Sequence, residues 1–190
     1  WNVSIKSRLE TDMEKVFKDE SNETTPPSLQ IDFSEALWAT DKLNSIFHKA
    51  GIPLNDVDFI AETDEELIFV ECKNANRIDA TNPDFNPADD RKLNIIARKY
   101  YDSLNFCMFS ERGLSKRKIY CFIVEAKLGS ITLRNQWKIL LAKRLPFELQ
   151  KQSHFPMKMI DELNVMSIGE WNKKYPQFPI TRLIEEICPN

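Results

Sequence analysis

Two apolar segments separated by a short acidic run constrain the fold of this chain more than any other feature. Residues 57–61 and 67–72 are rich in β-branched and aromatic residues, and the polar run 63–66 lies between them. This pattern predicts a β-hairpin. If the turn is centred on the polar run, Asp58 lies directly opposite Glu71.

The predicted hairpin gathers charged side chains on one face. Partners across two strands have Cβ atoms about 4.5–5.5 Å apart. The period of two puts Lys73 on the face of Glu71 and Cys72 on the other. Carboxylates placed opposite each other repel, and a hard divalent cation that takes oxygen ligands relieves this repulsion. We therefore predict a Mg²⁺ or Mn²⁺ site held by Asp58, Glu71 and the Cys72 carbonyl. The alternative is an edge hairpin with solvated acids and a surface lysine.

The same residues resemble a known family. Asp58, twelve intervening residues and then Glu71-Cys72-Lys73 at the end of an apolar strand resemble the PD-(D/E)XK nuclease superfamily, which has the restriction-endonuclease-like fold. The chain departs from the family pattern at residues 55–57, where a proline often precedes the aspartate. The resemblance implies an α/β domain of three layers with a central mixed β-sheet flanked by helices. It also implies that Asp58, Glu71 and Lys73 are catalytic.

The family often supplies one more acidic ligand from the helix before the hairpin. A helical pattern runs from Ile31 or Ser34 to about Lys49, and Glu35 near its start is the candidate ligand, with Asp41 as the alternative. Glu35 is equally well explained as an acidic residue that stabilises a helix N-terminus.

A second Glu-x-Lys triplet, Glu125 to Lys127, also follows an apolar strand. No aspartate precedes it at hairpin distance, since the nearest ones are Asp102 and Asp90. We interpret it as the end of a core strand covered on both sides, over residues 118–125.

Charge is distributed unevenly along the chain. Residues 1–90 carry 8 Lys and Arg against 20 Asp and Glu, whereas residues 91–151 carry 14 against 4. A basic block joined to an acidic site suits an enzyme that acts on a polyanion. The candidate nucleic-acid contacts lie in the polar loop 74–86 and on one side of the following helix, and they are Asn74, Arg77, Arg91, Lys92, Arg98 and Lys99. A merely solvated basic face is the alternative.

The remaining pattern predicts the other elements. A helix is expected over 3–17, a loop over 19–28, and a helix capped by Asn86 with Leu93, Ile96, Ala97, Tyr100 and Leu104 buried. A helix is expected over 132–145 and a strand over 157–165. A capping box at Ser167 and Glu170 predicts a short helix, and a last helix is expected over 180–188. The family that the chain resembles usually has another strand between the second helix and Asp58, and only residues 52–55 are available for it.

Length and composition indicate one ordinary domain. The 190 residues, 42% hydrophobic and 29% charged, are expected to form a single unit over 1–190. It comprises an N-terminal helix and loop (1–30), a catalytic core (31–151) and a C-terminal extension (152–190). The chain has no apolar run long enough to span a membrane. The four cysteines, at 72, 107, 121 and 188, are expected to be reduced core thiols of a cytoplasmic protein.

These observations predict a metal-dependent nuclease that hydrolyses phosphodiester bonds of nucleic acid, with DNA favoured over RNA. The alternative is a nucleic-acid-binding or scaffold module of the same fold without turnover, because a fold can lose its chemistry and keep its shape. A homodimer or a larger complex remains open for either function.

Overall fold

The computed structural model describes residues 15–18, 29–74, 89–125 and 130–183. Its central sheet has the order β3-β4-β5-β6-β7, with strands Trp38–Thr40, Phe59–Glu62, Glu66–Asn74, Arg117–Glu125 and Glu162–Met166. A second sheet has the order β1-β2-β8, with strands Val16–Lys18, Leu29–Asp32 and Ile180–Arg182. The helices are α1 (Leu43–Lys49), α2 (Asp90–Phe109), α3 (Ile131–Ala142), α4 (Ile168–Lys174) and the 3-10 turn Leu149–Lys151. Within the described ranges, no helix is both long enough and apolar enough to cross a lipid bilayer.

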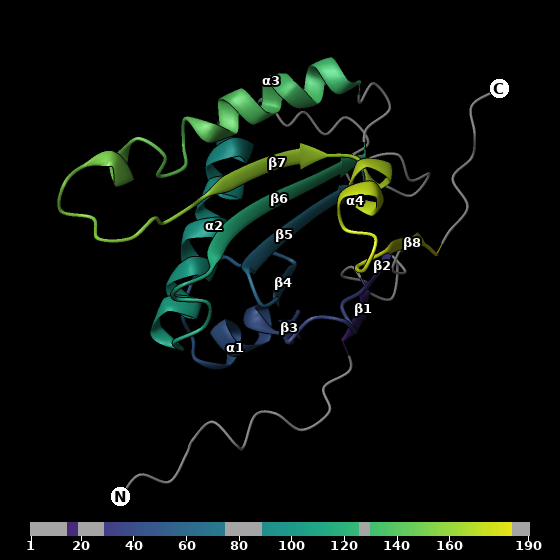
Figure 1. The fold of residues 1–190 in the computed structure, drawn as a ribbon, viewed down its shortest axis with the longest axis horizontal. Coiled ribbons are helices and arrows are strands. Elements are labelled where there is room, and N and C mark those ends of the chain that lie inside the picture. Colours follow the sequence, from purple (N-terminus) through teal and green to yellow (C-terminus); the bar gives the residue numbers. More distant parts are fainter. Residues whose placement is uncertain (1–14, 19–28, 75–88, 126–129, 184–190) are drawn as a thin grey trace, which may run out of the picture.

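The central sheet is mixed. Strands β3, β4 and β5 are antiparallel neighbours, whereas β5, β6 and β7 run parallel. Helices α1, α2 and α3 pack on one face, and α4 and the second sheet pack on the other (Figure 1). The expected α/β class with a central mixed sheet flanked by helices is confirmed at this level.

The predicted hairpin and its register are confirmed. Phe59 lies opposite Val70 and Glu62 opposite Leu67, and this register continues to Asp58 and Glu71. Alternate residues of β5 enter different cores: Val70 and Cys72 contribute to the core beside the second sheet, and Phe69 to the core beneath α2. Because side chains alternate along a strand, Glu71 and Lys73 share the α2 face.

The predicted central strand and basic helix are also confirmed. Strand β6 lies between β5 and β7, and its buried residues alternate between the two cores, as in Cys121 and Phe122. The predicted stripe of α2 is buried throughout. The N-cap is Asp89, not Asn86, because its side chain accepts the N–H groups of Arg91 and Lys92.

The predicted helix from Ile31 or Ser34 to Lys49 is wrong in its first half. This stretch forms β2, a turn and β3 before α1 begins at Leu43. Leu29, Ile31 and Phe33 are buried at alternate positions, which is the period of a strand. Pairing with β8 and β4 outweighs the local helical pattern, since tertiary context overrides propensity.

Where the structure describes the two ends of the chain, strands lie in place of the predicted helices. Most of the expected helix over 3–17 and the loop over 19–28 lie outside the described residues, but Phe17 belongs to β1 and packs on Phe59. The expected helix over 180–188 is wrong where the structure describes it, because Ile180 begins β8, which pairs with β2. No strand forms over 52–55. The strand that pairs with the outer side of the hairpin is β3, which precedes α1.

The elements after β6 agree with the sequence pattern more closely. Helix α3 ends at Ala142, three residues before the predicted end. Of the strand expected over 157–165, only the second part forms, as β7 at Glu162–Met166, and residues 157–161 are not strand. The capping box is present in full, with the Ser167 and Glu170 side chains each accepting the other's backbone N–H. The segment assigned to the C-terminal extension thus provides an edge strand of the central sheet.

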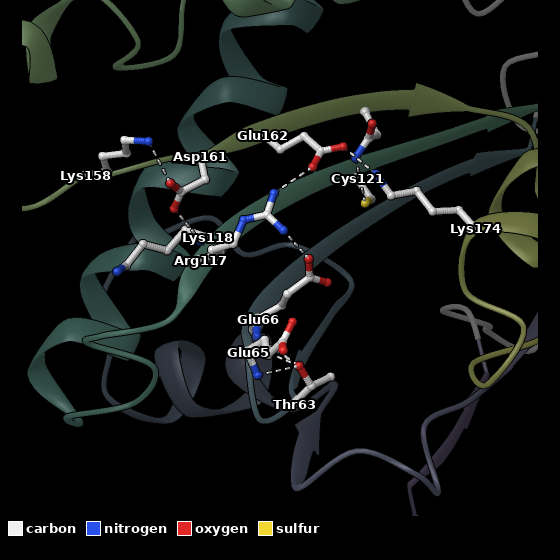
Figure 2. Close-up of polar contacts among 11 residues, drawn as sticks. Thr63, Glu65, Glu66, Arg117, Lys118, Cys121, Lys158, Asp161, Glu162 and Lys174 are labelled. Carbon is white, nitrogen blue, oxygen red and sulfur yellow. Dashed lines mark hydrogen bonds and ion pairs between the residues drawn. The ribbon is translucent and has the colours of Figure 1, made fainter.

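An ion-pair network ties together the first residues of the three parallel strands. Arg117 of β6 donates to Glu66 of β5 at 3.0 Å and to Glu162 of β7 at 3.2 Å. Figure 2 shows this arginine between the two carboxylates, with Lys174 on the far side of Glu162. The network lies at the end of β5 opposite to Glu71 and Lys73, so it aligns the strands without taking part in the acidic site.

Three of the four cysteines belong to the core, as predicted. Cys72, Cys107 and Cys121 are buried. Burial raises the pKa of Cys107 and of Cys121 to about 12. These two thiols are therefore neutral at physiological pH and unreactive. Cys188 lies outside the described residues.

Candidate functional site

The segment that leads into Asp58 is held by two helices. The backbone N–H of Asn55 donates to Asp102 of α2 at 2.9 Å, and that of Val57 donates to the buried Ser103 hydroxyl at 3.0 Å. The Asp56 carboxylate accepts a bond of 3.3 Å from Asn44 of α1. The segment before β4 is therefore held by both α1 and α2.

Asp58 and Glu71 converge across the hairpin. One oxygen of Asp58, Oδ2, accepts the backbone N–H of Cys72 at 2.7 Å. Glu71 has no exposed surface, and its Oε1 lies 2.7 Å from the Lys73 ammonium. The predicted cluster of two carboxylates and Lys73 on one face is thus confirmed.

A fourth side chain completes the cluster. The ammonium of Lys99, from the middle of α2, lies 3.4 Å from Asp58 Oδ1 and 2.8 Å from Glu71 Oε2. It bridges the remaining oxygens of the two acids. We define these four residues, Asp58, Glu71, Lys73 and Lys99, as the acidic-pair site.

Burial and charge shift the pKa values in this site in different directions. Burial would raise the pKa of Asp58, but Lys73, Lys99 and the Cys72 N–H together hold it below its usual value. Burial and the neighbouring Asp58 charge raise the pKa of Glu71. Burial opposes the charged form of each lysine, but the two carboxylates outweigh it and raise the pKa of Lys73 and of Lys99. Both ammonium groups are therefore charged at neutral pH.

Glu35 is not brought to this site. It is exposed in the turn between β2 and β3, and β3 runs antiparallel to β4 with Trp38 opposite Glu62. Glu35 therefore lies toward the end of β4 away from Asp58. The physical reason is the strand that replaces the first half of the predicted helix. The alternative, Asp41, follows β3 toward the Asp58 end and is exposed.

The predicted nucleic-acid contacts separate into several groups. Arg91 and Arg98 of α2 are exposed, and Arg98 also pairs with Asp102 at 3.4 Å. Lys92 and Asn74 are half-buried, and Arg77 lies outside the described residues. Lys99 departs from the prediction, because its ammonium faces the carboxylates and not the outer surface of the helix.

The second Glu-x-Lys triplet has a structural role, as predicted for its glutamate. Glu125 ends β6 and accepts the backbone N–H of Ile168, the first residue of α4, at 2.8 Å. Its other oxygen lies 3.4 Å from Arg182 of β8. Glu125 therefore links the central sheet to the layer that covers it. Lys127 lies outside the described residues.

The sequence did not predict the role of Lys99. It also did not predict the two hydrogen bonds that Asp102 and Ser103 of α2 accept from the segment before Asp58. The available signal was the position of Lys99 between Ile96 and Tyr100, two members of the buried stripe, which places it at the border of that stripe. The contact itself joins residues 28 positions apart in the chain. Local spacing carries no information on such a contact.

The carboxylates of Asp58 and Glu71 provide a small set of oxygen ligands that suits a hard divalent cation. Asp58 and Glu71 each direct one oxygen at a cationic group, which is the Lys99 ammonium in this structure. One or two carboxylates with retained waters are a common ligand set for Mg²⁺. Among the residues that the structure describes, no group of three or more His, Cys, Asp or Glu side chains is placed to hold a metal. The Cys72 carbonyl remains a predicted ligand.

No protein-family model, curated protein or solved structure matches this chain. The functional interpretation therefore depends on the geometry of its own residues.

Proposed function

We propose that this protein is a Mg²⁺- or Mn²⁺-dependent nuclease that hydrolyses phosphodiester bonds of nucleic acid, DNA in preference to RNA, on a restriction-endonuclease-like fold. One observation carries the proposal. The hairpin register brings Asp58 and Glu71 together, and Lys73 lies 2.7 Å from Glu71 on the same face. Two acids and a lysine in this arrangement are the residues that the resemblance to the PD-(D/E)XK superfamily implies.

Hydrolysis of a phosphodiester forms one P–O bond from water and breaks another, leaving a phosphomonoester and a hydroxyl group. Asp58 and Glu71 would hold the cation, which when bound stabilises negative charge on the phosphate and lowers the pKa of water. The Lys73 ammonium would orient the attacking water or a phosphoryl oxygen and stabilise the charge that develops there. Because Lys73 stays protonated beside Glu71, its role is electrostatic.

The place of the site in the sheet also supports the proposal. Glu71 and Lys73 lie at the carboxyl end of β5. Ligands of open α/β sheets bind outside the carboxyl ends of their strands. The exposed arginines Arg91 and Arg98 lie on α2, the helix that contributes Lys99. A backbone phosphate at the acidic-pair site would therefore have basic residues nearby.

The rival function is a nucleic-acid-binding or scaffold module without turnover. The Lys99 bridge between Asp58 and Glu71 favours the binding module. An ammonium group there already neutralises the acids that a metal would need. The small ligand set among the described residues favours it as well. The retention of Lys73 beside the acids favours the nuclease.

Cleavage of end-labelled DNA with Mn²⁺ and with EDTA tests the proposal. We expect wild-type protein to cleave DNA with Mn²⁺ and to stop when EDTA is added. Asp58→Asn should lose activity and recover part of it at higher Mn²⁺, because the change weakens the cation site. Asp64→Asn, in the exposed turn of the same hairpin, is the matched control and should cleave normally. Wild-type protein that binds DNA but cleaves neither DNA nor RNA with any divalent metal would establish the binding module instead.

A further inference from the structure

The positive and negative charges of the acidic-pair site balance each other. Two carboxylates face two ammonium groups, and their ion pairs have N–O separations of 2.7, 2.8 and 3.4 Å. The formal charges of these four groups cancel. A divalent cation added without any other change would give the buried site a net double positive charge, which is costly in a medium of low dielectric constant. One ammonium therefore has to leave when the cation enters.

The geometry identifies which ammonium leaves. Among the described residues, Lys73 forms its ion pair with Glu71, through Oε1. Lys99 contacts one oxygen of each acid, and these are the two oxygens that a shared cation would use. The Lys99 ammonium thus lies where a cation shared by the two acids would be held, whereas Lys73 lies beside Glu71.

We propose that Lys99 is a resident counter-ion of the acidic pair that a divalent cation displaces, and that the displaced ammonium then binds the backbone phosphate of the nucleic acid. This inference rests on the proposed nuclease function and adds a residue to its substrate site. Lys99 would thus have two successive partners. They are the two carboxylates in the metal-free protein and a backbone phosphate in the protein that has bound the cation and nucleic acid.

The surroundings of Lys99 allow this exchange without movement of the helix. Its side chain is 20% exposed, so its ammonium has a path to solvent along a flexible four-carbon stem. Helix α2 is held nearby by the hydrogen bonds that Asp102 and Ser103 accept from the backbone N–H groups of Asn55 and Val57. The side chain can therefore turn outward while the carboxylates keep their places.

The new partner follows from the chemistry on α2. Lys92 lies two helical turns before Lys99, on the same side of the helix, and Arg91 and Arg98 are exposed beside these lysines. A phosphate that approaches the cation would meet this basic surface. An ammonium released from Asp58 and Glu71 then has an anion within reach, so that cation and phosphate binding assist each other.

Isothermal titration of Mn²⁺ into the substrate-free protein tests the displacement. Lys99→Gln keeps a hydrogen-bond donor but removes the competing charge, so Mn²⁺ should bind roughly tenfold or more tightly than to wild type, within the 5- to 150-fold usual for coupled sites. Lys99→Arg keeps the charge and should bind Mn²⁺ as weakly as wild type or more weakly. The charge-matched control Lys138→Gln, on the exposed side of α3, should not change Mn²⁺ affinity.

A second readout must change in the opposite direction. With Mn²⁺ saturating, Lys99→Gln should bind a DNA duplex more weakly than wild type, because the phosphate loses its ammonium. A purely structural lysine would not tighten one ligand and loosen the other. Thermal melting checks that each variant is folded. If Lys99→Gln does not fold, tighter Mn²⁺ binding by Lys99→Arg would overturn the proposal.

The inference and the proposed function fail in different ways. Equal Mn²⁺ affinity of wild type and Lys99→Gln overturns the displacement, even if the wild type cleaves DNA. Absence of cleavage by wild-type protein overturns the nuclease, even if Lys99→Gln binds Mn²⁺ more tightly. Loss of Mn²⁺ binding in Lys99→Gln would show that Lys99 supports the site instead of competing for it, and this too overturns the displacement.

Discussion

Lys73 and Lys99 approach Glu71 from different elements, and this difference separates their expected effects. Lys73 belongs to the same strand as Glu71, two positions away, and its side chain is 37% exposed. Lys99 reaches both acids from α2. A change at Lys73 therefore leaves the bridge between the acids intact. The two lysines can be tested independently, although both contact one carboxylate.

Lys73→Met should slow the chemical step and leave binding nearly unchanged. Loss of one preorganised electrostatic contact in a transition state costs on the order of 10²–10³ in rate. The measurement is single-turnover cleavage of labelled DNA across a series of Mn²⁺ concentrations. In contrast to Asp58→Asn, added Mn²⁺ should not rescue this variant. Wild-type cleavage by Lys73→Met would remove Lys73 from the catalytic assignment.

The residues of the site differ in how far the sequence could predict them. Asp58, Glu71 and Lys73 lie in one hairpin, so local strand periodicity fixed their common face. Lys99 joins them through a contact between a helix and the hairpin, and helical spacing alone placed it with the solvent-facing basic residues. Glu35 was misplaced because its assignment depended on a helix that does not form there.

At the scale of elements, helix α2 has a structural role in addition to its basic surface. Asp102 and Ser103 are buried polar residues in the middle of an otherwise apolar side. Both accept backbone N–H groups of the segment before β4. They satisfy donors that would otherwise be buried without partners, and they fix the start of the strand that Asp58 precedes.

Ser103→Ala should destabilise the protein and weaken the cation site. The variant leaves the Val57 N–H without its hydroxyl acceptor, and a buried donor without a partner costs about 1–3 kcal/mol. Urea unfolding of the wild type and the variant measures the free-energy difference. Ser115→Ala, in the exposed turn before β6, is the control and should change stability by less than about 0.5 kcal/mol. Equal stability of the two variants would exclude this role for Ser103.

Elements with a strong local signal were predicted, and those made by distant pairing were not. The capping box at Ser167 and the buried stripe of α2 depend on neighbours within the same helix. Strands β3 and β8 have only three residues each and exist through pairing with β4 and β2. Short strands of this kind carry too few residues for a periodic signal.

At the scale of the whole molecule, basic residues are concentrated in the middle third of the chain. Residues 91–151 carry 14 Lys and Arg against 4 Asp and Glu. The fold divides this block between structural and exposed positions. Lys118 is buried, Arg117 joins two strands and Arg144 pairs with Asp90, whereas Arg91, Arg98, Lys138 and Lys143 are exposed. The exposed members can contact a polyanion without breaking an ion pair between elements of the fold.

The salt dependence of DNA binding distinguishes the α2 surface from the rest of this basic block. Each phosphate contact to duplex DNA contributes about 0.9 to the slope of log K against log salt. If Arg91 and Arg98 both contact phosphates, the double variant Arg91→Gln/Arg98→Gln should flatten the slope by about twice that amount. The double variant Lys138→Gln/Lys143→Gln removes the same charge from α3 and from the residue that follows it, and it should keep the wild-type slope. The measurement is fluorescence anisotropy with a labelled duplex at several salt concentrations. An equal reduction in both double variants would show that DNA responds to net charge and not to the α2 surface, whereas a reduction confined to Arg91 and Arg98 would place the nucleic-acid backbone beside the acidic-pair site.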